Sequence, residues 1–268
     1  MRLLNAAALP CRSFFVASQR PTPRARFLIA CHSDRSPIDT YAFNWDRPPQ
    51  DPSDVILFWF GHPLSSPKLR EVSYMRSRVK VWFNFDPLID AKARKFVSLI
   101  RKAAVHELRG PEWASEEGLV ARLILLDQLP RNAFRGTAEA FSYDEVAANV
   151  ANEIIRKSED ATRLAAPIGL FVTTSLMHSE SLAQHRRAAK FVNDMLQSKN
   201  EVALQVFERQ KKELASHSAV LARFGRYPHR NALLGRASTG AELRWLASDS
   251  VPGWARSQER RRESSFLR

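Results

Sequence analysis

Apolar residues recur at steps of three and four along most of the chain, and this spacing predicts helices. The clearest stripe runs through Ala203, Phe207, Gln210, Leu214, His217, Leu221 and Phe224. Alternating steps of four and three place these residues on one face of a long helix. Convincing strand alternation is absent, and residues 79–85 are the only competing segment. The pattern predicts an all-α fold built from antiparallel helical hairpins.

Residues that cap or end helices predict where the other helices lie. We expect a short helix over 55–60 that Ser53 or Asp54 caps and Gly61 ends, and a helix of about 22 residues from Asp86–Pro87 to Gly110. A third begins at Ser115 and ends at Pro130, and a fourth spans 182–196. Capping boxes at Ser142/Glu145 and Thr239/Glu242 predict two more, the first ending near Lys157. The apolar residues of 55–60 are expected to dock on the core.

The first 33 residues have the composition of an organellar presequence. They contain five Arg and no Asp or Glu, and the first acid is Asp34. This pattern is typical of a mitochondrial or plastid transit segment. A basic tail with no targeting role is the alternative; a secretory signal needs an apolar stretch, which Asn5, Pro10 and Arg12 interrupt. We expect a soluble mitochondrial protein of the matrix whose mature chain begins between roughly residues 20 and 45.

Composition narrows the class of protein and its organisation. We expect a presequence-like segment over 1–36, a Pro-rich linker over 37–52, one helical domain over 53–250 and a basic tail over 251–268. Of the net charge of +13, residues 1–36 supply six Arg against one Asp, and residues 256–268 five Arg against two Glu. Nucleic-acid binding is therefore assigned to the tails alone. Cys11 and Cys31 are the only cysteines, which argues against a disulfide framework or a cysteine-based zinc site in the domain.

Other common classes lack their signatures. No G-x-G-x-x-G or G-x-x-x-x-G-K-[ST] motif occurs, so we expect no cofactor. The longest clean apolar run, 164–172, is far short of the ~20 residues that span a bilayer, so no membrane span is expected.

Two polar motifs follow strongly apolar helices, and a third, smaller group lies between them. The first motif, LLDQLPRNAFRGT, offers Asp127, Gln128, Arg131, Asn132 and Arg135. The second, ARFGRYPHRNALLGRAST, offers Arg226, His229, Arg230, Asn231 and Arg236. The third is MHSE, with His178 and Glu180, followed by Gln184; His217 precedes the second motif.

Four interpretations of these motifs stay open. The Arg and Asn side chains can hold helix ends, and His217 can be a hydrogen-bonded core histidine. Alternatively they form an anion pocket, in which several Arg bind phosphate or carboxylate. A metal-dependent hydrolase would use Asp127, Glu180 and the histidines as ligands, although no ligand spacing supports it and no metal site is assigned. A concave helical surface that binds a peptide or a ribonucleoprotein is the fourth.

The two main motifs are expected to converge on one pocket or one buried network. Asp127, Glu180 and Glu139 are the acids within reach in the motifs, against at least five Arg. An isolated buried Arg is costly, so this imbalance predicts room for an external anion.

The three strings resemble the signature blocks of the bacterial and organellar family called domain of unknown function 924. The resemblance covers about residues 53–247 and implies an all-helical, tetratricopeptide-repeat-like fold, and it implies no reaction. One departure is Thr173–Ser175, where relatives usually carry an aromatic residue and Pro.

The function we favour from the sequence is a helical interaction protein of an organelle, not an enzyme. It would have a protein or ribonucleoprotein partner, such as the ribosome, and an anion-binding site. The alternative is a hydrolase that acts on a phosphorylated small molecule and is possibly metal-dependent.

Overall fold

The computed structural model describes residues 45–255, and residues 1–44 and 256–268 lie outside the described part. The chain divides into two units, Met1–Arg35 and Ser36–Arg268, and all described residues belong to the second. The expected presequence, much of the expected linker and the end of the basic tail therefore lie outside the described residues.

Within residues 45–255 every regular element is helical, which confirms the all-α prediction. The α-helices are α1 (Pro52–Phe60), α2 (Val72–Phe83), α3 (Pro87–Ala93), α4 (Val97–Ala104), α5 (Pro111–Ala114), α6 (Glu116–Ala133), α7 (Asp144–Lys157), α8 (Ala166–His178), α9 (Leu182–Met195), α10 (Glu201–Phe224) and α11 (Gly240–Leu246). Short 3₁₀ helices are η1 (Pro67–Arg70), η2 (Arg94–Phe96), η3 (Ala138–Phe141), η4 (Ala161–Arg163) and η5 (Pro228–Arg230). None of the described helices is long and apolar enough to cross a membrane.

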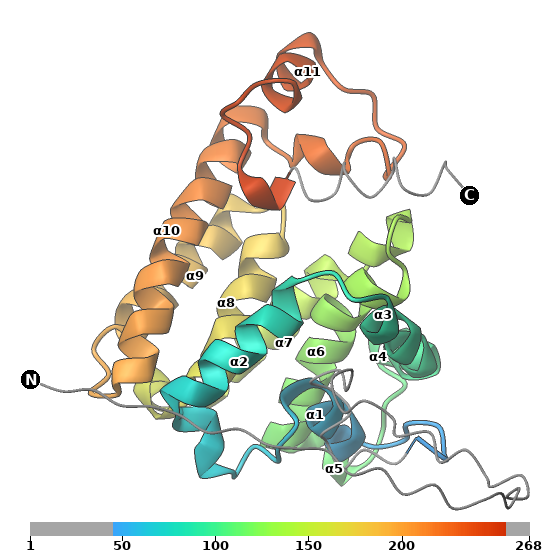
Figure 1. Cartoon of the computed structure of the whole chain (residues 1–268), viewed down its shortest axis with the longest axis vertical. Helices are drawn as coiled ribbons and strands as arrows, with labels where there is room; N and C mark the ends of the chain where they lie inside the picture. Colours follow the sequence, from blue (N-terminus) through green and yellow to red (C-terminus); the bar gives the residue numbers. More distant parts are fainter. Residues whose placement is uncertain (1–44, 256–268) are drawn as a thin grey trace, which may run out of the picture. The chain divides into compact units, whose positions relative to one another are not determined.

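Helix α6 is the centre of the packing. It contacts α1, α3, α4 and α5 on the N-terminal side of the chain, and α7 and α8 on the other. From α6 to α10 each helix packs on the one before it, and α10 also contacts α8, so that α8, α9 and α10 lie side by side (Figure 1). The likeness to tetratricopeptide repeats in detail stays a prediction.

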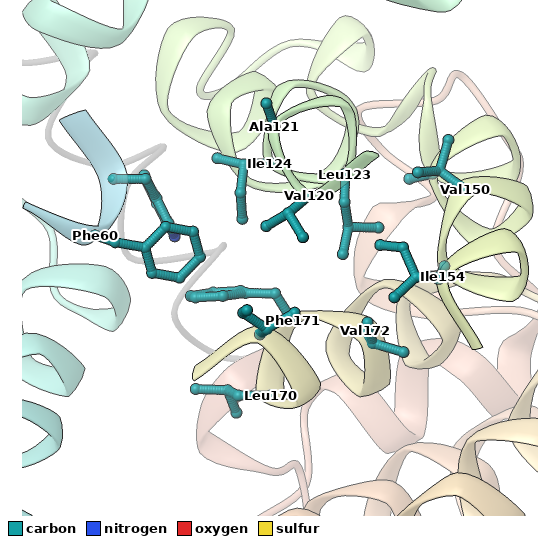
Figure 2. Packing of buried hydrophobic residues seen from close by; sticks show 14 of the residues in the cluster. Phe60, Val120, Ala121, Leu123, Ile124, Val150, Ile154, Leu170, Phe171 and Val172 are labelled. Carbon is teal, nitrogen blue, oxygen red and sulfur yellow. The ribbon is translucent and has the colours of Figure 1, made fainter. Parts of the chain in front are cut away.

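The main apolar core lies between α1, α6, α7 and α8 (Figure 2). Phe60 from α1 and Phe171 from α8 meet edge to face with ring centroids 5.8 Å apart. Phe58 and Trp59 are buried as well, so the predicted docking of this short helix on the core is confirmed. Gly61 ends α1 in the left-handed conformation, with φ of 73°, as its position predicts.

A second, smaller cluster joins the end of α10 to the last part of the described chain. It contains Val220, Tyr227, Trp245, Val251 and Ala255. Packing therefore continues through residue 255, and Trp254 stacks on His217 of α10 with ring centroids 3.9 Å apart.

Three helix caps were predicted correctly, because each one involves only residues close together in the sequence. Asp86, Ser115 and Thr239 each accept a backbone N–H at the start of α3, α6 and α11. Thr239 and Glu242 form the expected capping box. Helices α9 and α10 also lie where the apolar stripes place them.

Other predicted boundaries are wrong. Asp51, not Ser53 or Asp54, caps α1, because its side chain accepts the Asp54 N–H while the Asp54 carboxylate bonds back. The helix from Pro87 is divided by η2 and ends at Ala104, before Gly110. Residues 79–83 belong to α2 and form no strand.

Two further predictions, at Pro130 and at Ser142, are also wrong. Pro130 lies inside α6, because the Phe134 N–H bonds the Pro130 carbonyl and closes one more turn. Ser142 and Glu145 form no capping box. Ser142 donates to the Ala138 carbonyl, and Glu145 accepts the Ser179 hydroxyl from another helix.

Three helices, α2, α5 and α8, were not predicted from the sequence. Twelve of the residues of α8 are buried, so this helix shows no amphipathic stripe. Thr173 and Thr174, at the departure from the family pattern, lie in α8 and donate to the carbonyls of Gly169 and Leu170.

Candidate functional site

The site is centred on a buried pair, Asp127 and His178. Asp127 lies in the second-to-last turn of α6 and is fully buried, and His178 is the last residue of α8. The Asp127 Oδ1 and His178 Nδ1 atoms are 2.6 Å apart, a distance typical of a charge-assisted hydrogen bond. Gln128 donates to the other carboxylate oxygen. Helix packing thus joins residues 51 positions apart.

Asp144, at the first position of α7, links the two Arg-containing motifs. Its carboxylate accepts from Arg131 at 3.0 Å and from Arg230 at 2.8 Å. Arg131 also donates to the Asp127 carbonyl at 2.6 Å, so Asp144, Arg131 and Asp127 form a continuous chain to His178. The predicted convergence of the motifs is confirmed in its geometry. Their role in binding stays a prediction.

Burial and neighbouring charge set the protonation of the central pair. Burial alone would raise the pKa of Asp127, but the interactions with His178 and Arg131 outweigh it and hold this pKa well below its usual range. Burial and the positive charge of Arg131 lower the pKa of His178. At neutral pH we therefore assign an ionised Asp127 and a neutral His178.

A cavity of about 470 Å³ adjoins His178. Its walls come from α2, α8, α10 and the segment 252–254, and most of them are apolar. The polar lining residues are Thr174, His178, Arg209, Gln210, Glu213, Ser216 and His217. An apolar cavity of this size with a few convergent polar groups is the usual form of a small-molecule site.

Two further predicted histidines lie next to this cavity. His217 lines it, and its Nδ1 atom lies 2.8 Å from the Glu213 carbonyl oxygen. His229 does not line it but meets the Trp254 ring at 5.1 Å, and the Nδ1 atom of His229 has no hydrogen-bond partner among the described residues. Burial lowers the pKa of both, that of His217 to about 3.

The remaining predicted residues hold the fold together away from the cavity. Arg135 pairs with Asp90, Arg226 with Glu242 and Arg236 with Glu180, at closest distances of 2.5, 2.7 and 2.6 Å. Asn132 and Asn231 accept from Arg135 and Arg236. Gln184 accepts from Asn152.

The expected shortage of acids is wrong. Asp90, Asp144 and Glu242 lie outside the motifs in sequence, yet they supply the missing carboxylates in space. Glu139 pairs instead with Arg101. The five motif Arg that are not exposed each have a carboxylate partner, so the imbalance argument for an external anion no longer holds.

Three contributors to the site were missed. Asp144 was hidden inside the apparent capping box, one position before Glu145. Trp254 falls in the expected basic tail, where only its aromatic character marks it. Gln210 was assigned to the apolar stripe of α10, and a lone amide on such a stripe is the signal that could have identified it.

No group of His, Cys, Asp and Glu within residues 45–255 is arranged to hold a metal ion.

Comparisons with known proteins agree with the resemblance seen in the sequence. Residues 55–250 match the model of a family described as "Bacterial protein of unknown function (DUF924)". The structure of a protein of unknown function from Agrobacterium tumefaciens is similar to this one, with a TM-score of 0.57 and 27% sequence identity. The match covers 73% of this chain and 96% of that chain. No curated protein matches the sequence.

Proposed function

The chain belongs to the family called domain of unknown function 924, and we propose that it is an enzyme that acts on a small molecule in the cavity beside α10. The observation that carries this proposal is the orientation of His178. Its Nδ1 atom is held by Asp127, and the residue also lines the cavity. The proposed role of His178 is that of a general base.

The tautomer of His178 follows from its partner. An ionised carboxylate only accepts hydrogen bonds. The Nδ1 atom of His178 therefore carries a proton and donates the hydrogen bond to Asp127. In neutral imidazole the lone pair is then on Nε2, which has no partner among the described residues. A carboxylate behind a neutral histidine fixes both the orientation and the tautomer of a catalytic base.

Arg131 supports this arrangement. It binds both Asp127 and Asp144, so it keeps Asp127 ionised and disfavours a proton on His178. A base that is neutral at working pH is ready to accept a proton. We propose that His178 takes a proton from a water molecule, whose oxygen bonds to the acyl carbon or phosphorus of an ester. The bond to the leaving oxygen breaks, and His178 returns the proton to that oxygen, which places the reaction among the hydrolases.

The test compares esters of different acids. Purified protein is assayed with p-nitrophenyl acetate, p-nitrophenyl butyrate and p-nitrophenyl phosphate, which separates carboxyl esters from phosphate esters. His178→Gln and Asp127→Asn should each lose roughly 10²–10⁴-fold in turnover, the usual contribution of a general base. His106→Asn is the control, because His106 is exposed and has a positive φ of 58° that Asn tolerates.

Turnover that survives His178→Gln would contradict the proposal. An independent check is the tautomer itself. Long-range imidazole NMR spectra should show the proton of His178 on Nδ1 at neutral pH. A proton on Nε2 would contradict the proposal, because that atom could then not accept a proton.

A helical interaction protein remains the second candidate, and one observation favours it. Phe83, Phe85 and Leu88, at the connection from α2 to α3, are 49%, 54% and 41% exposed. Such a group is unusual on a surface without a partner. If the partner is a ribosomal particle, the protein should co-sediment with it, and Leu88→Asp should abolish this.

An anion site near Arg230 is favoured by the buried Nε atom of Arg230, which has no partner among the described residues. Phosphate bound there should raise the unfolding temperature of the wild type and not that of Arg230→Gln. Equal shifts of the unfolding temperature in both proteins would mean that phosphate acts as a general salt and does not bind near Arg230.

The mitochondrial address is proposed from the sequence of residues 1–33 alone. A fluorescent fusion that lacks these residues should fail to enter mitochondria, and unchanged import would disprove the address.

A further inference from the structure

Three side chains of the cavity lining, His178, His217 and Gln210, each have an acceptor atom without a partner among the described residues. We propose that the cavity binds an uncharged ligand with an apolar body and a hydroxyl or amide N–H donor, and that it rejects anions. This proposal rests on the proposed function, since it uses the same cavity, and it names the class of substrate. Three side chains carry it: His178, His217 and Gln210.

His217 offers a lone pair to the cavity. Its Nδ1 atom is 2.8 Å from the Glu213 carbonyl oxygen, and a carbonyl can only accept, so Nδ1 carries the proton. Burial keeps the ring neutral at physiological pH. The Nε2 atom is then an acceptor, and it has no partner among the described residues. His178 presents its Nε2 in the same way.

Gln210 adds a third polar group in need of a partner. Its side chain lines the cavity, the residue is only 7% exposed, and its buried Oε1 atom has no hydrogen-bond partner within residues 45–255. A buried amide oxygen without a partner has lost its hydration uncompensated, so a ligand that donates to it removes this cost. Gln210 lies two turns before His217 on the same face of α10.

The cationic side chain in the described lining of the cavity, Arg209, is paired with a carboxylate. Arg209 and Glu213 lie one turn apart on α10, and the Arg209 Nε atom is 3.9 Å from the Glu213 Oε1 atom. Arg131 and Arg230 are directed to Asp144 and line no part of the cavity. An anion is costly to desolvate in a cavity whose guanidinium is already paired, whereas an alcohol or amide donates to the three acceptors.

The apolar walls of the cavity determine which kind of apolar group the ligand carries. Met75, Val79 and Phe83 of α2 face Leu170 and Met177 of α8 and Val206 of α10 around the cavity. These side chains suit an aromatic or branched aliphatic group.

The experiment uses three probes that share one skeleton: 3-phenylpropan-1-ol, 3-phenylpropanamide and 3-phenylpropanoate. Binding to the full chain is measured by calorimetry, and the methyl NMR signals of Met75 and Met177 report whether a probe enters the cavity. The alcohol and the amide should bind at least about tenfold tighter than the carboxylate, because a desolvated charge without a partner is costly.

The variants identify the groups that contact the probe. Gln210→Leu and His217→Phe should weaken alcohol binding by about fivefold or more, since each removes one acceptor. Gln205→Leu is the control on the same helix, because Gln205 is exposed and bonded to Glu201. Urea unfolding of each variant confirms that it is folded.

The outcomes separate this inference from the proposed function. If the carboxylate binds as tightly as the alcohol or more tightly, and still shifts Met75 and Met177, the cavity stands and the inference is wrong. If no probe shifts these signals at millimolar concentration, both the inference and the proposed small-molecule function fail.

Discussion

A single carboxylate, Asp144, holds two buried Arg from distant parts of the chain. Arg131 is 17% exposed at its side chain and Arg230 only 6%, so water compensates little if the carboxylate is lost. Breaking a buried pair leaves an uncompensated charge. The residue is therefore more important to stability than an exposed ion pair is.

We predict that Asp144→Asn lowers the free energy of unfolding by about 3 kcal/mol, as expected for a buried pair that loses one charge. The matched control is Asp160→Asn, where the pair with Arg163 is exposed and 3.8 Å apart. It should change stability by less than about 0.5 kcal/mol. Urea denaturation measures both, and equal effects would show that Asp144 is not a shared anchor.

The buried histidines predict how stability depends on pH. His178, His185, His217 and His229 all have a lowered pKa in the folded state, mainly because of burial. Below a pH of about 6.5 the unfolded chain binds protons that the folded chain does not. Acid therefore favours unfolding, and each histidine that stays neutral contributes up to about 1.4 kcal/mol per pH unit.

The measurement is urea unfolding between pH 7 and roughly pH 5, above the range in which most carboxylates titrate. Stability should fall as pH falls, and the slope should decrease by about one proton in His217→Phe. If the pH dependence of stability has the same slope in His217→Phe as in the wild type, then His217 is protonated in the folded protein and this prediction is wrong.

At the scale of elements, α10 shows how a helix end depends on one glycine. Gly225 follows Phe224 with φ of 70°, and its N–H bonds the Leu221 carbonyl. This turn directs the chain from α10 into η5, which carries His229 and Arg230. The end of α10 thus positions the second motif.

Gly225→Ala should destabilise the protein by about 1–2 kcal/mol, the cost of a left-handed conformation for a residue with a Cβ. A Cβ at this position meets no atom within 4 Å, so the cost is conformational and not steric. Gly240→Ala, at the start of α11 without a positive φ, is the control and should be neutral within about 0.5 kcal/mol. Thermal unfolding compares them, and equal shifts would refute the turn argument.

At the scale of the whole molecule, the segment 251–255 completes both the second apolar cluster and the cavity. Val251 and Ala255 are buried beside Tyr227, and Trp254 donates to Ser216 at 3.2 Å. One segment near the C-terminus thereby ties α10 to the site.

Trp254→Ala should lower the free energy of unfolding by about 2 kcal/mol, less than for a fully buried Trp because the side chain is partly exposed. Hydrogen exchange should speed up in residues 217–224 of α10. The reference is a deletion of residues 256–268, which removes no contact of Trp254 described above. If the deletion and the point variant give the same exchange pattern, Trp254 does not secure α10.

The sequence by itself determined the helical class, the caps at Asp86, Ser115 and Thr239, and the long helix that ends at Phe224. These features depend on neighbours within one or two turns, so local spacing and side-chain chemistry suffice to predict them. Pro130 does not end its helix, because the Phe134 N–H bonds its carbonyl. The expected capping box fails because Glu145 bonds Ser179 of a distant segment instead of the backbone at Ser142.

Only the tertiary structure decided which polar residues meet. Asp127 contacts His178 across 51 positions and Arg230 contacts Asp144 across 86, while Asp90 neutralises Arg135 from another helix. The sequence motifs contain the Arg and His residues of the site but not Asp144. An acid at the start of a helix has the same sequence signal whether its side chain faces water or a buried guanidinium. Helix packing makes that distinction, and it gives each motif Arg that is not exposed a carboxylate partner.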